Sequence, residues 1–312
     1  MSNISIVIPV YNEEETLPQL FKRLDNLVDT LGTDHNVEFL LVNDGSVDGS
    51  LDLITAKGRI DSRYKVLSFS RNFGHQSALL AGITKANGDA VIAMDADLQD
   101  PPEVIIQLLA EWELGSDVVY AERRQRNGES FFKKFSASTF YGLIDWLSDT
   151  HLPRNVGDFR LMDRRVVDVL TQLPEKSLYL RGLVSWVGFK QTSVVYDRDA
   201  RFAGETKYSM KKMINLAADA LLSFSEKPLR IVTRLGFLVT TAAFLLLAFF
   251  LVTAFWGPSN QVHGWLSMIF AILFLGGMQL ICLGIVGEYV SRIYRESKER
   301  PLYIIDDRKS SL

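Results

Sequence analysis

Two long apolar stretches in the C-terminal third constrain most strongly what this chain can fold into. Residues Leu235–Trp256 and Trp265–Gly287 contain no Asp, Glu, Lys or Arg. As a helix, each is long enough to cross the ~30 Å hydrocarbon core of a bilayer. We therefore predict two transmembrane helices within residues 231–290, preceded by an amphipathic juxtamembrane helix at 207–230 and followed by a cytoplasmic tail at 291–312.

Basic residues predict the orientation of this hairpin. Lys227, Arg230 and Arg234 precede the first stretch, and the turn between the stretches, 257–264, has no Lys or Arg. Four further basic residues follow the second stretch: Arg292, Arg295, Lys298 and Arg300. Because basic flanks stay on the cytoplasmic side, we expect a multi-pass protein of the inner (plasma) membrane with its head and both termini in the cytoplasm. The tail is expected to run along the membrane face or to contact another subunit.

The composition excludes several classes of function. The 312 residues carry a net charge of −3, so the chain lacks the basic footprint of a nucleic-acid-binding protein. The single cysteine, Cys282, falls inside the second apolar stretch, which excludes a disulfide framework and a thiolate metal cage. We interpret the four scattered histidines as ordinary residues: His35, His75, His151 and His263.

Residues 1–206 have the pattern of an α/β catalytic domain. The predicted strands are Ile4–Val10, Val37–Val42, Lys65–Phe69, Ala90–Met94 and Val118–Ala121, and the predicted helices between them are Thr16–Leu31, Val47–Ile60, Gln76–Ala86 and Pro101–Leu114. This alternation with short links predicts a Rossmann-like, mostly parallel sheet with helices on both faces. Thr16 and Gln19 are expected to form a capping box at the start of the first helix.

Polar residues follow four of the predicted strands. They are Tyr11-Asn12-Glu13, Asn43-Asp44, Ser70-Arg71-Asn72 and Asp95-Ala96-Asp97. Ligands bind beyond the carboxyl ends of the strands in such sheets, so these residues are expected to share one rim. Two carboxylates separated by one residue can reach one hard cation, and Mg²⁺ or Mn²⁺ prefers oxygen ligands and substrate phosphates. No glycine-rich phosphate loop is present, so side chains and metal would hold a nucleotide.

Two further segments have the spacing of amphipathic helices. Residues 131–147 and 210–221 each place apolar side chains on one face and lysines on the other. Each helix either packs against the sheet or lies on the membrane surface with its lysines near the headgroups.

Five segments carry a resemblance to a known family. Val7–Glu14, Val42–Ser50 and Met94–Glu103 resemble the motifs of family 2 glycosyltransferases of the GT-A fold. Asn155–Leu161 and Arg201–Tyr208, together with the two-span hairpin, resemble the polyprenyl-phosphate glycosyltransferases. The likeness is greatest to bacterial bactoprenol (undecaprenyl-phosphate) glucosyltransferases. Dolichyl-phosphate mannose synthases share the early motifs but usually differ at Gly157-Asp158-Phe159.

The resemblance implies a reaction, a cofactor and a donor site. The reaction is the inverting transfer of a hexose, with glucose from UDP-glucose favoured, to polyprenyl phosphate at the cytoplasmic membrane face, and it uses Mg²⁺ or Mn²⁺. The resemblance places Pro9, Tyr11, Glu13, Asp44 and Asp95 around the nucleotide sugar. It assigns the metal to three residues: Asp95, Asp97 and Gln99. An Asx-turn is the alternative role for Asp44.

The acceptor requires capture more than activation. A phosphate monoester has a second pKa near ~6, so it is largely dianionic at neutral pH. Its candidate binding residues are Arg123, Lys133, Lys134, Arg201, Thr206 and Lys207. The resemblance makes Asp158 the catalytic base. Two other roles stay open for Asp158: orienting the acceptor or a sugar hydroxyl, or pairing structurally with Arg160 or Arg164.

Other functions are compatible with the same sequence. The donor could instead be GDP-mannose or a UDP-linked 4-amino-arabinose derivative, because a few pocket residues determine sugar choice. A non-catalytic partner in lipid-carrier translocation is a second class, but two spans without charged residues offer no polar path for a headgroup. The residues do not define a subunit number, and a homo-oligomer such as a tetramer is compatible with them.

Overall fold

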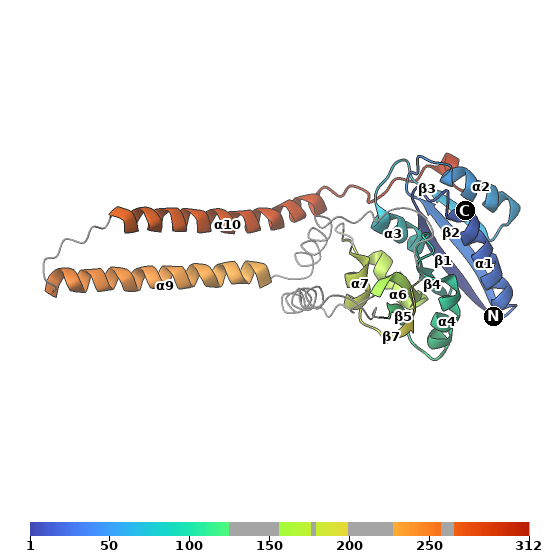
Figure 1. The fold of residues 1–312 in the computed structure, drawn as a ribbon, viewed down its shortest axis with the longest axis horizontal. Helices are drawn as coiled ribbons and strands as arrows, with labels where there is room; N and C mark the ends of the chain where they lie inside the picture. The colour runs from blue at the N-terminus through green and yellow to red at the C-terminus, as the bar shows by residue number, and fades with distance from the viewer. Residues whose placement is uncertain (125–155, 176–178, 199–226, 257–264, 312) are drawn as a thin grey trace.

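A computed structural model describes residues 1–124, 156–175, 179–198, 227–256 and 265–311. The chain forms an α/β head and two long helices that extend away from it side by side (Figure 1). The sequence expectations for Phe131–Leu147 and for residues 207–226 therefore lie outside the described residues.

The head is built on one seven-stranded sheet in the order β3-β2-β1-β4-β6-β5-β7. Its strands are β1 (Ser2–Val10), β2 (His35–Asn43), β3 (Tyr64–Ser68), β4 (Ala90–Ala93), β5 (Val118–Arg123), β6 (Val156–Asp163) and β7 (Gln191–Tyr196). Only β6 runs antiparallel to its neighbours in this described sheet; the other pairings are parallel. The predicted mostly parallel α/β architecture is confirmed.

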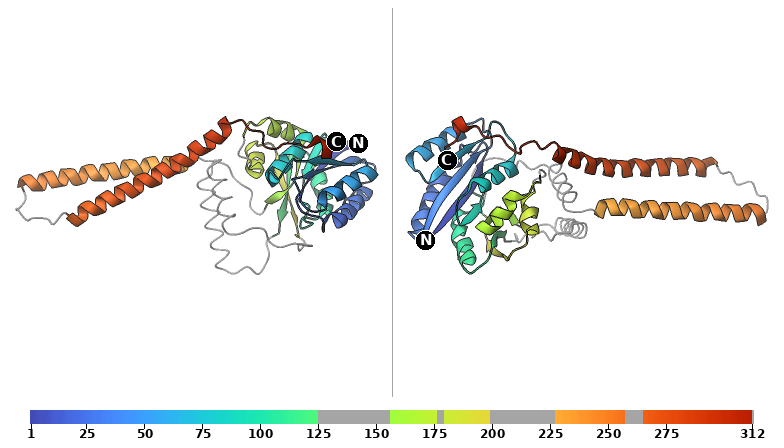
Figure 2. Two further views of the ribbon diagram at one scale, coloured as in Figure 1. Left: turned by 90° about the horizontal axis from the view of Figure 1, so that it is seen from above. Right: turned by 180° about the vertical axis from the view of Figure 1, so that it is seen from behind.

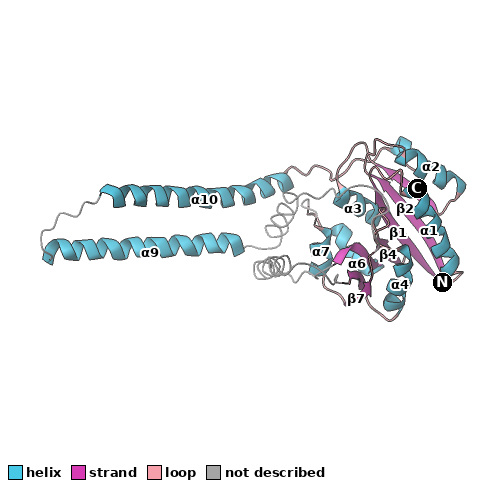
Figure 3. Ribbon diagram, viewed as in Figure 1, coloured by secondary structure: helices cyan, strands magenta, loops and turns pink. Residues whose placement is uncertain are grey.

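Helices cover both faces of the sheet (Figure 3). They are α1 (Leu17–Leu31), α2 (Ser50–Ile60), α3 (His75–Lys85), η1 (Pro102–Val104), α4 (Ile105–Glu113), α6 (Arg164–Gln172) and α7 (Leu180–Trp186). Side chains alternate across a strand, so Ile6 and Ile8 of β1 join the core under α1, α2 and α4, whereas Val7 joins the core under α3, α6 and α7. Both faces of β1 are thus buried, which explains its continuous apolar sequence.

The start of α1 differs from the predicted capping box. The hydroxyl of Thr16 makes no capping bond to the helix and donates instead to the carbonyl and the carboxylate of Glu13, each at 3.0 Å. Pro18 lies in the first turn, where a missing N–H costs nothing. The helix is therefore entered through a turn closed by Glu13, and the capping-box prediction is wrong.

The two apolar stretches form α9 (Lys227–Trp256) and α10 (Trp265–Ser297), which are longer than the predicted spans at one end each. Large apolar side chains such as Phe237 and Leu280 are exposed along them, as expected for surfaces that face lipid. Among the described residues, Phe274–Ser297 meets the length and hydropathy of a membrane span.

The tail after α10 turns back to the head of its own chain (Figure 2). It forms antiparallel bridges from Ile305 to Phe69 and from Ser311 to Val66, at the edge strand β3. A short 3₁₀ turn, η2 (Asp307–Lys309), lies between these bridges. The tail thus pairs with the head of its own chain, an arrangement that the two expected ones, along the membrane face or against another subunit, did not include; unpaired backbone groups of an edge strand provide this partner.

Candidate active site

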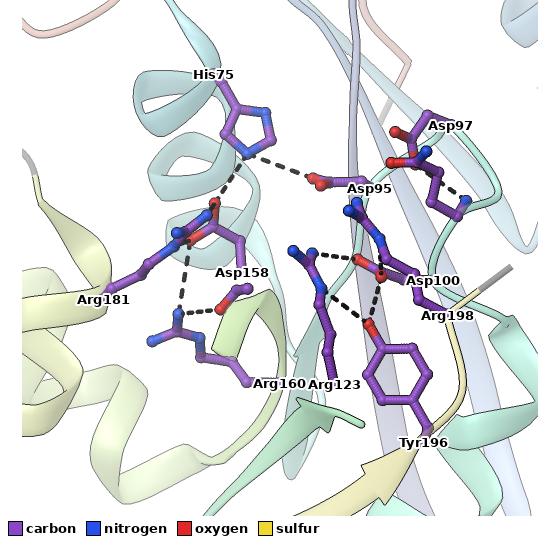
Figure 4. Close-up of polar contacts among 12 residues, drawn as sticks. His75, Asp95, Asp97, Asp100, Arg123, Asp158, Arg160, Arg181, Tyr196 and Arg198 are labelled. Atoms are coloured by element: carbon purple, nitrogen blue, oxygen red, sulfur yellow. Dashed lines mark hydrogen bonds and ion pairs between the residues drawn. The ribbon is translucent and has the colours of Figure 1, made fainter. Parts of the chain in front are cut away.

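Polar side chains from the end of β4, from β6 and from the start of α3 meet at one edge of the sheet. Asp95 lies just after β4, and Asp158 is the third residue of β6. Because β6 runs antiparallel to β4, its first residues lie at the edge where β4 ends. The loop after β3 leads into α3, whose first residue, His75, reaches the same edge (Figure 4).

His75 bridges the two carboxylates. Its Nε2 lies 3.4 Å from Asp95 Oδ1 and 3.3 Å from Asp158 Oδ2. Burial acts to lower the pKa of His75, but the two adjacent carboxylates outweigh it and raise that pKa. The interpretation of His75 as an ordinary residue is wrong.

Asp158 is a buried carboxylate surrounded by donors. Arg181 donates to both of its oxygens at 2.9 Å, and Arg160 Nη2 lies 3.5 Å from Oδ1. Burial alone would raise the pKa of Asp158, but the hydrogen bond with His75 and the charge of Arg181 hold it well below the usual value. Arg164 instead donates to the carbonyls of residues 86 and 88, so a pairing of Asp158 with Arg164 is excluded.

Asp95 has the opposite electrostatic character. Burial, together with the negative charges of Asp158, Asp100 and Asp97, raises the pKa of its carboxyl to about 6, although His75 acts in the other direction. Asp95 Oδ1 is buried and accepts no hydrogen bond from the residues that the structure describes, since the contact with His75 is not an aligned one. An orphaned carboxylate oxygen among other carboxylates is a site that favours a cation.

Asp95 and Asp97 are the carboxylates that the sequence motif assigns to a hard divalent cation. One residue, Ala96, separates Asp97 from Asp95. The Oδ1 of Asp97 accepts the backbone N–H of Gln99 at 3.1 Å in a turn that places Leu98 at a φ of 57°. No group of three or more His, Cys, Asp and Glu side chains arranged for a metal is found in the described part of the chain. A site of two carboxylates suits Mg²⁺ or Mn²⁺ because these ions complete their coordination with water and substrate phosphates.

Asp44 is fixed by the loop after β3. Its buried carboxylate accepts the backbone N–H of Phe73 at 2.7 Å and that of Gly74 at 3.0 Å. Burial raises the pKa of Asp44, while these two bonds oppose the rise. The Asx-turn at this position is made by Asn43, which accepts the Ser46 N–H, so that alternative role for Asp44 is wrong.

The other predicted donor-site residues lie at the ends of β1 and just after it. Pro9 is buried within β1 beside Val42, and Tyr11 is 40% exposed. Glu13 accepts the hydroxyl of Thr16 and donates its backbone N–H to Ser50 Oγ. Pro9 thus lies at the end of β1, Tyr11 and Glu13 follow β1, and Asp44 follows β2, the strand that pairs with β1.

A second polar cluster surrounds Asp100, which is fully buried. Arg123 Nη2 lies 3.3 Å from Asp100 Oδ2, Arg198 Nε lies 3.2 Å from Oδ1, and the hydroxyl of Tyr196 donates to Oδ1. Both arginine side chains remain about one-third exposed. Five predicted acceptor residues lie outside the described residues: Lys133, Lys134, Arg201, Thr206 and Lys207.

Sequence reasoning missed the residues that hold these carboxylates. His75, Arg181, Tyr196 and Arg198 belong to no motif with chemical spacing, and three of them follow residue 175 in sequence. One signal was available for His75, because it follows the Ser70-Arg71-Asn72 strand end that was placed on the rim. Arg181 and Arg198 are brought to the rim by the tertiary fold, which the local sequence pattern does not predict.

Comparison with known proteins identifies the family. The model of glycosyl transferase family 2 matches residues 5–171, and the model of the GtrB C-terminal hairpin matches residues 227–293. The chain belongs to glycosyl transferase family 2. The glycosyltransferase therefore carries a family 2 catalytic domain followed by a segment that matches the GtrB C-terminal hairpin.

Similar proteins align with this glycosyltransferase over nearly its whole length. A Bacillus subtilis (strain 168) glycosyltransferase, YkcC, is 48% identical over 96% of this chain and 92% of its own. The bactoprenol glucosyl transferase of Shigella phage SfV is 44% identical over 98% and 99% of the two chains, and a prophage bactoprenol glucosyl transferase homolog of Escherichia coli (strain K12) is 44% identical over 97% and 98%.

A solved structure supports the fold independently. The mannosyl-3-phosphoglycerate synthase of Rubrobacter xylanophilus superposes with a TM-score of 0.50 at 15% identity and covers 75% of each chain. At this identity the likeness concerns the fold alone.

Proposed function

We propose that this glycosyltransferase transfers glucose from UDP-glucose to undecaprenyl phosphate at the cytoplasmic face of the membrane. The observation that carries the proposal is the full-length similarity, over head and hairpin together, to proteins named bactoprenol glucosyl transferase. The cluster of carboxylates at the sheet edge provides the chemistry that such a transfer requires, and the hairpin keeps the head beside a lipid acceptor.

The donor side of the reaction uses the ends of β1, β2 and β4. Asp44 and the residues after β1, Tyr11 and Glu13, bind the nucleoside in this proposal. A divalent cation held by Asp95, Asp97 and Gln99 would neutralise the charge that grows on the departing nucleoside diphosphate. The fit of the site supports this, because Asp95 carries an orphaned oxygen beside other carboxylates.

The acceptor side uses Asp158 and the arginines. The phosphate dianion attacks the anomeric carbon in a single displacement, which inverts the configuration of the donor. A carboxylate with a pKa as low as that of Asp158 is a weak base, and the dianion has little need of one. We therefore assign Asp158 to orienting the reacting groups, while Arg181, Arg160 and His75 reduce its repulsion of the incoming phosphate.

Arg123 is the described member of the proposed acceptor-phosphate site. Its guanidinium is anchored on Asp100, which leaves part of it accessible, and Arg198 is held in the same way. Two anchored, partly exposed guanidinium groups form a prepared site for a phosphate, because their order is not lost on binding.

A panel of nucleotide sugars tests the proposal. The full-length protein in detergent is incubated with undecaprenyl phosphate, Mg²⁺ or Mn²⁺, and labelled UDP-glucose, GDP-mannose or a UDP-linked 4-amino-arabinose. We expect lipid-extractable product from UDP-glucose and its loss with EDTA. Preferred transfer from another donor would overturn the glucose assignment, and absence of product from every donor would overturn the transferase reaction.

One substitution tests the metal-binding carboxylates in the same assay. Asp97→Asn removes a charge at the sheet edge and is expected to reduce kcat/KM by about 100-fold or more, the scale of one electrostatic contact to a transition state. Asp168→Asn is the matched control, since Asp168 is an exposed carboxylate on α6 that makes one loose ion pair. Equal activity of the two variants would contradict the role of Asp97.

A further inference from the structure

The last residues of the C-terminal tail, 304–311, are bonded to β3 and to the residues just after it. Asp306 donates its backbone N–H to the carbonyl of Ser68 at 2.8 Å, and Ser70 donates to the carbonyl of Ile304 at 3.0 Å. Further along, Val66 and Ser311 exchange two backbone bonds of 2.8 and 2.7 Å. The tail therefore covers part of the unpaired edge of β3 with backbone hydrogen bonds.

One side chain of the tail reaches the loop that holds Asp44. The ring of Tyr303 stacks on that of Phe69, with centroids 5.0 Å apart and planes at 12°. Phe69 in turn meets the edge of Phe73 at 5.7 Å and 89°. Phe73 donates the backbone N–H that binds the Asp44 carboxylate at 2.7 Å. Three aromatic rings in contact thus connect the tail to the segment that binds Asp44, the donor loop (residues 69–74).

The backbone of the donor loop packs directly against the turn that follows Asp44. Gly45 has a φ of 68°, and a Cβ there would lie 2.4 Å from the carbonyl carbon of Arg71, so the backbone of the loop rests directly on the turn that follows Asp44. The guanidinium of Arg71 lies over the ring of Phe73 at 4.1 Å. A shift of Phe69 or Phe73 would therefore displace the amides of residues 73 and 74 from Asp44.

We propose that Tyr303 is a positioning residue for donor binding: through Phe69 and Phe73 it holds the donor loop in the shape in which it fixes Asp44. The inference rests on the proposed function, in which Asp44 binds the nucleoside. The tail would then connect the membrane helix to the donor loop, because it begins where α10 ends. Ser297 and Tyr303 are six residues apart, so at most ~20 Å of chain joins the membrane helix to the donor loop.

Kinetics of three tail variants of the full-length protein test this inference. We expect Tyr303→Ala to raise the KM for UDP-glucose about three- to tenfold, the scale of one lost aromatic contact, with kcat and the KM for undecaprenyl phosphate little changed. Tyr303→Phe keeps the ring and is expected to restore the donor KM. Ile304→Ala is the matched control, because Ile304 is the next residue of the tail and its side chain is 52% exposed. An unchanged donor KM in Tyr303→Ala would overturn the inference.

Hydrogen exchange gives a second reading that does not need turnover. We expect the amides of Phe73 and Gly74 to exchange faster in Tyr303→Ala than in the wild type, and at the wild-type rate in Tyr303→Phe. If Tyr303→Ala does not fold, Tyr303→Leu keeps the apolar volume without the stacked ring and is compared in the same way. Equal exchange in Tyr303→Leu and the wild type would overturn the inference, whereas a wild type that forms no product would overturn only the proposed function.

Discussion

At the scale of residues, the surroundings of Asp158 and Asp95 give these two carboxylates different electrostatic properties. Asp158 is compensated by Arg181 and Arg160, while Asp95 lies among other acids with an unbonded oxygen. His75 is in contact with both. Groups whose environments push their pKa values apart are suited to different tasks, here the orientation of reacting groups and the binding of a cation.

The compensation of Asp158 makes a stability prediction. Arg181→Met removes the bidentate partner of the buried Asp158 carboxylate and is expected to destabilise the head by about 2 kcal/mol. Breaking a fully buried ion pair costs ~3–5 kcal/mol. We expect a smaller loss here because Arg181 is 35% exposed and Arg160 still faces Asp158. The double variant Arg181→Met with Asp158→Asn is expected to regain part of the lost stability, since it no longer buries an uncompensated charge. Thermal unfolding in detergent measures both, and a double variant less stable than Arg181→Met alone would contradict the argument.

At the scale of elements, β6 determines where the site forms. Alternating apolar segments were sufficient to predict β1 to β5 and their helices, because periodicity is local. The direction and place of β6 were not predictable, because strand order depends on contacts between distant segments. Asp158 was found from a family motif, but its approach to Asp95 and Arg181 follows from β6 lying between β4 and β5. The residues around Asp100 could not be grouped from sequence for the same reason.

The start of α6 offers a test at this scale. Asp163 caps the helix by accepting the backbone N–H of Arg165 at 3.0 Å, and it also accepts the indole N–H of Trp112 at 2.8 Å. Burial would raise the pKa of Asp163, but the bonds from Trp112 and Arg165 lower it overall. A carboxyl whose pKa is lower in the folded than in the unfolded state stabilises the fold at any pH above its unfolded-state pKa, which is near ~3.9. This contribution is lost as the pH falls through the folded-state pKa.

We therefore expect Asp163→Ala to lower the stability by about 1 kcal/mol at pH 7, the usual scale of a lost helix cap. The difference in stability between this variant and the wild type should become smaller as the pH falls below ~4. Melting temperatures measured between pH 3 and pH 7 check this, with Asp168→Ala on the same helix as the control. A difference that stays constant to the lowest pH would show that charge has no part in the cap.

At the scale of the whole molecule, the exposed apolar surface of α9 and α10 requires a membrane around it. The basic residues at both outer ends of the hairpin place the head in the cytoplasm in our proposal. The tail adds a second connection between membrane and head, because it leaves α10 and pairs with β3. The head is thus attached through both ends of the hairpin.

Cysteine labelling tests the proposed topology. In a Cys282→Ala background, Ser259→Cys in the segment between the helices is expected to react with a membrane-impermeant maleimide added to intact cells. Ser297→Cys at the end of α10 is expected to react only after the cells are opened. The reverse pattern would place the head on the other side of the membrane.

The last residues of β5 are held from both sides. Glu122 stands opposite Val156 at the start of β6, and Arg123, the final residue of β5, pairs with Tyr196 of β7. A backbone change here therefore disturbs two neighbours together, the strand that carries Asp158 and the strand that precedes Arg198.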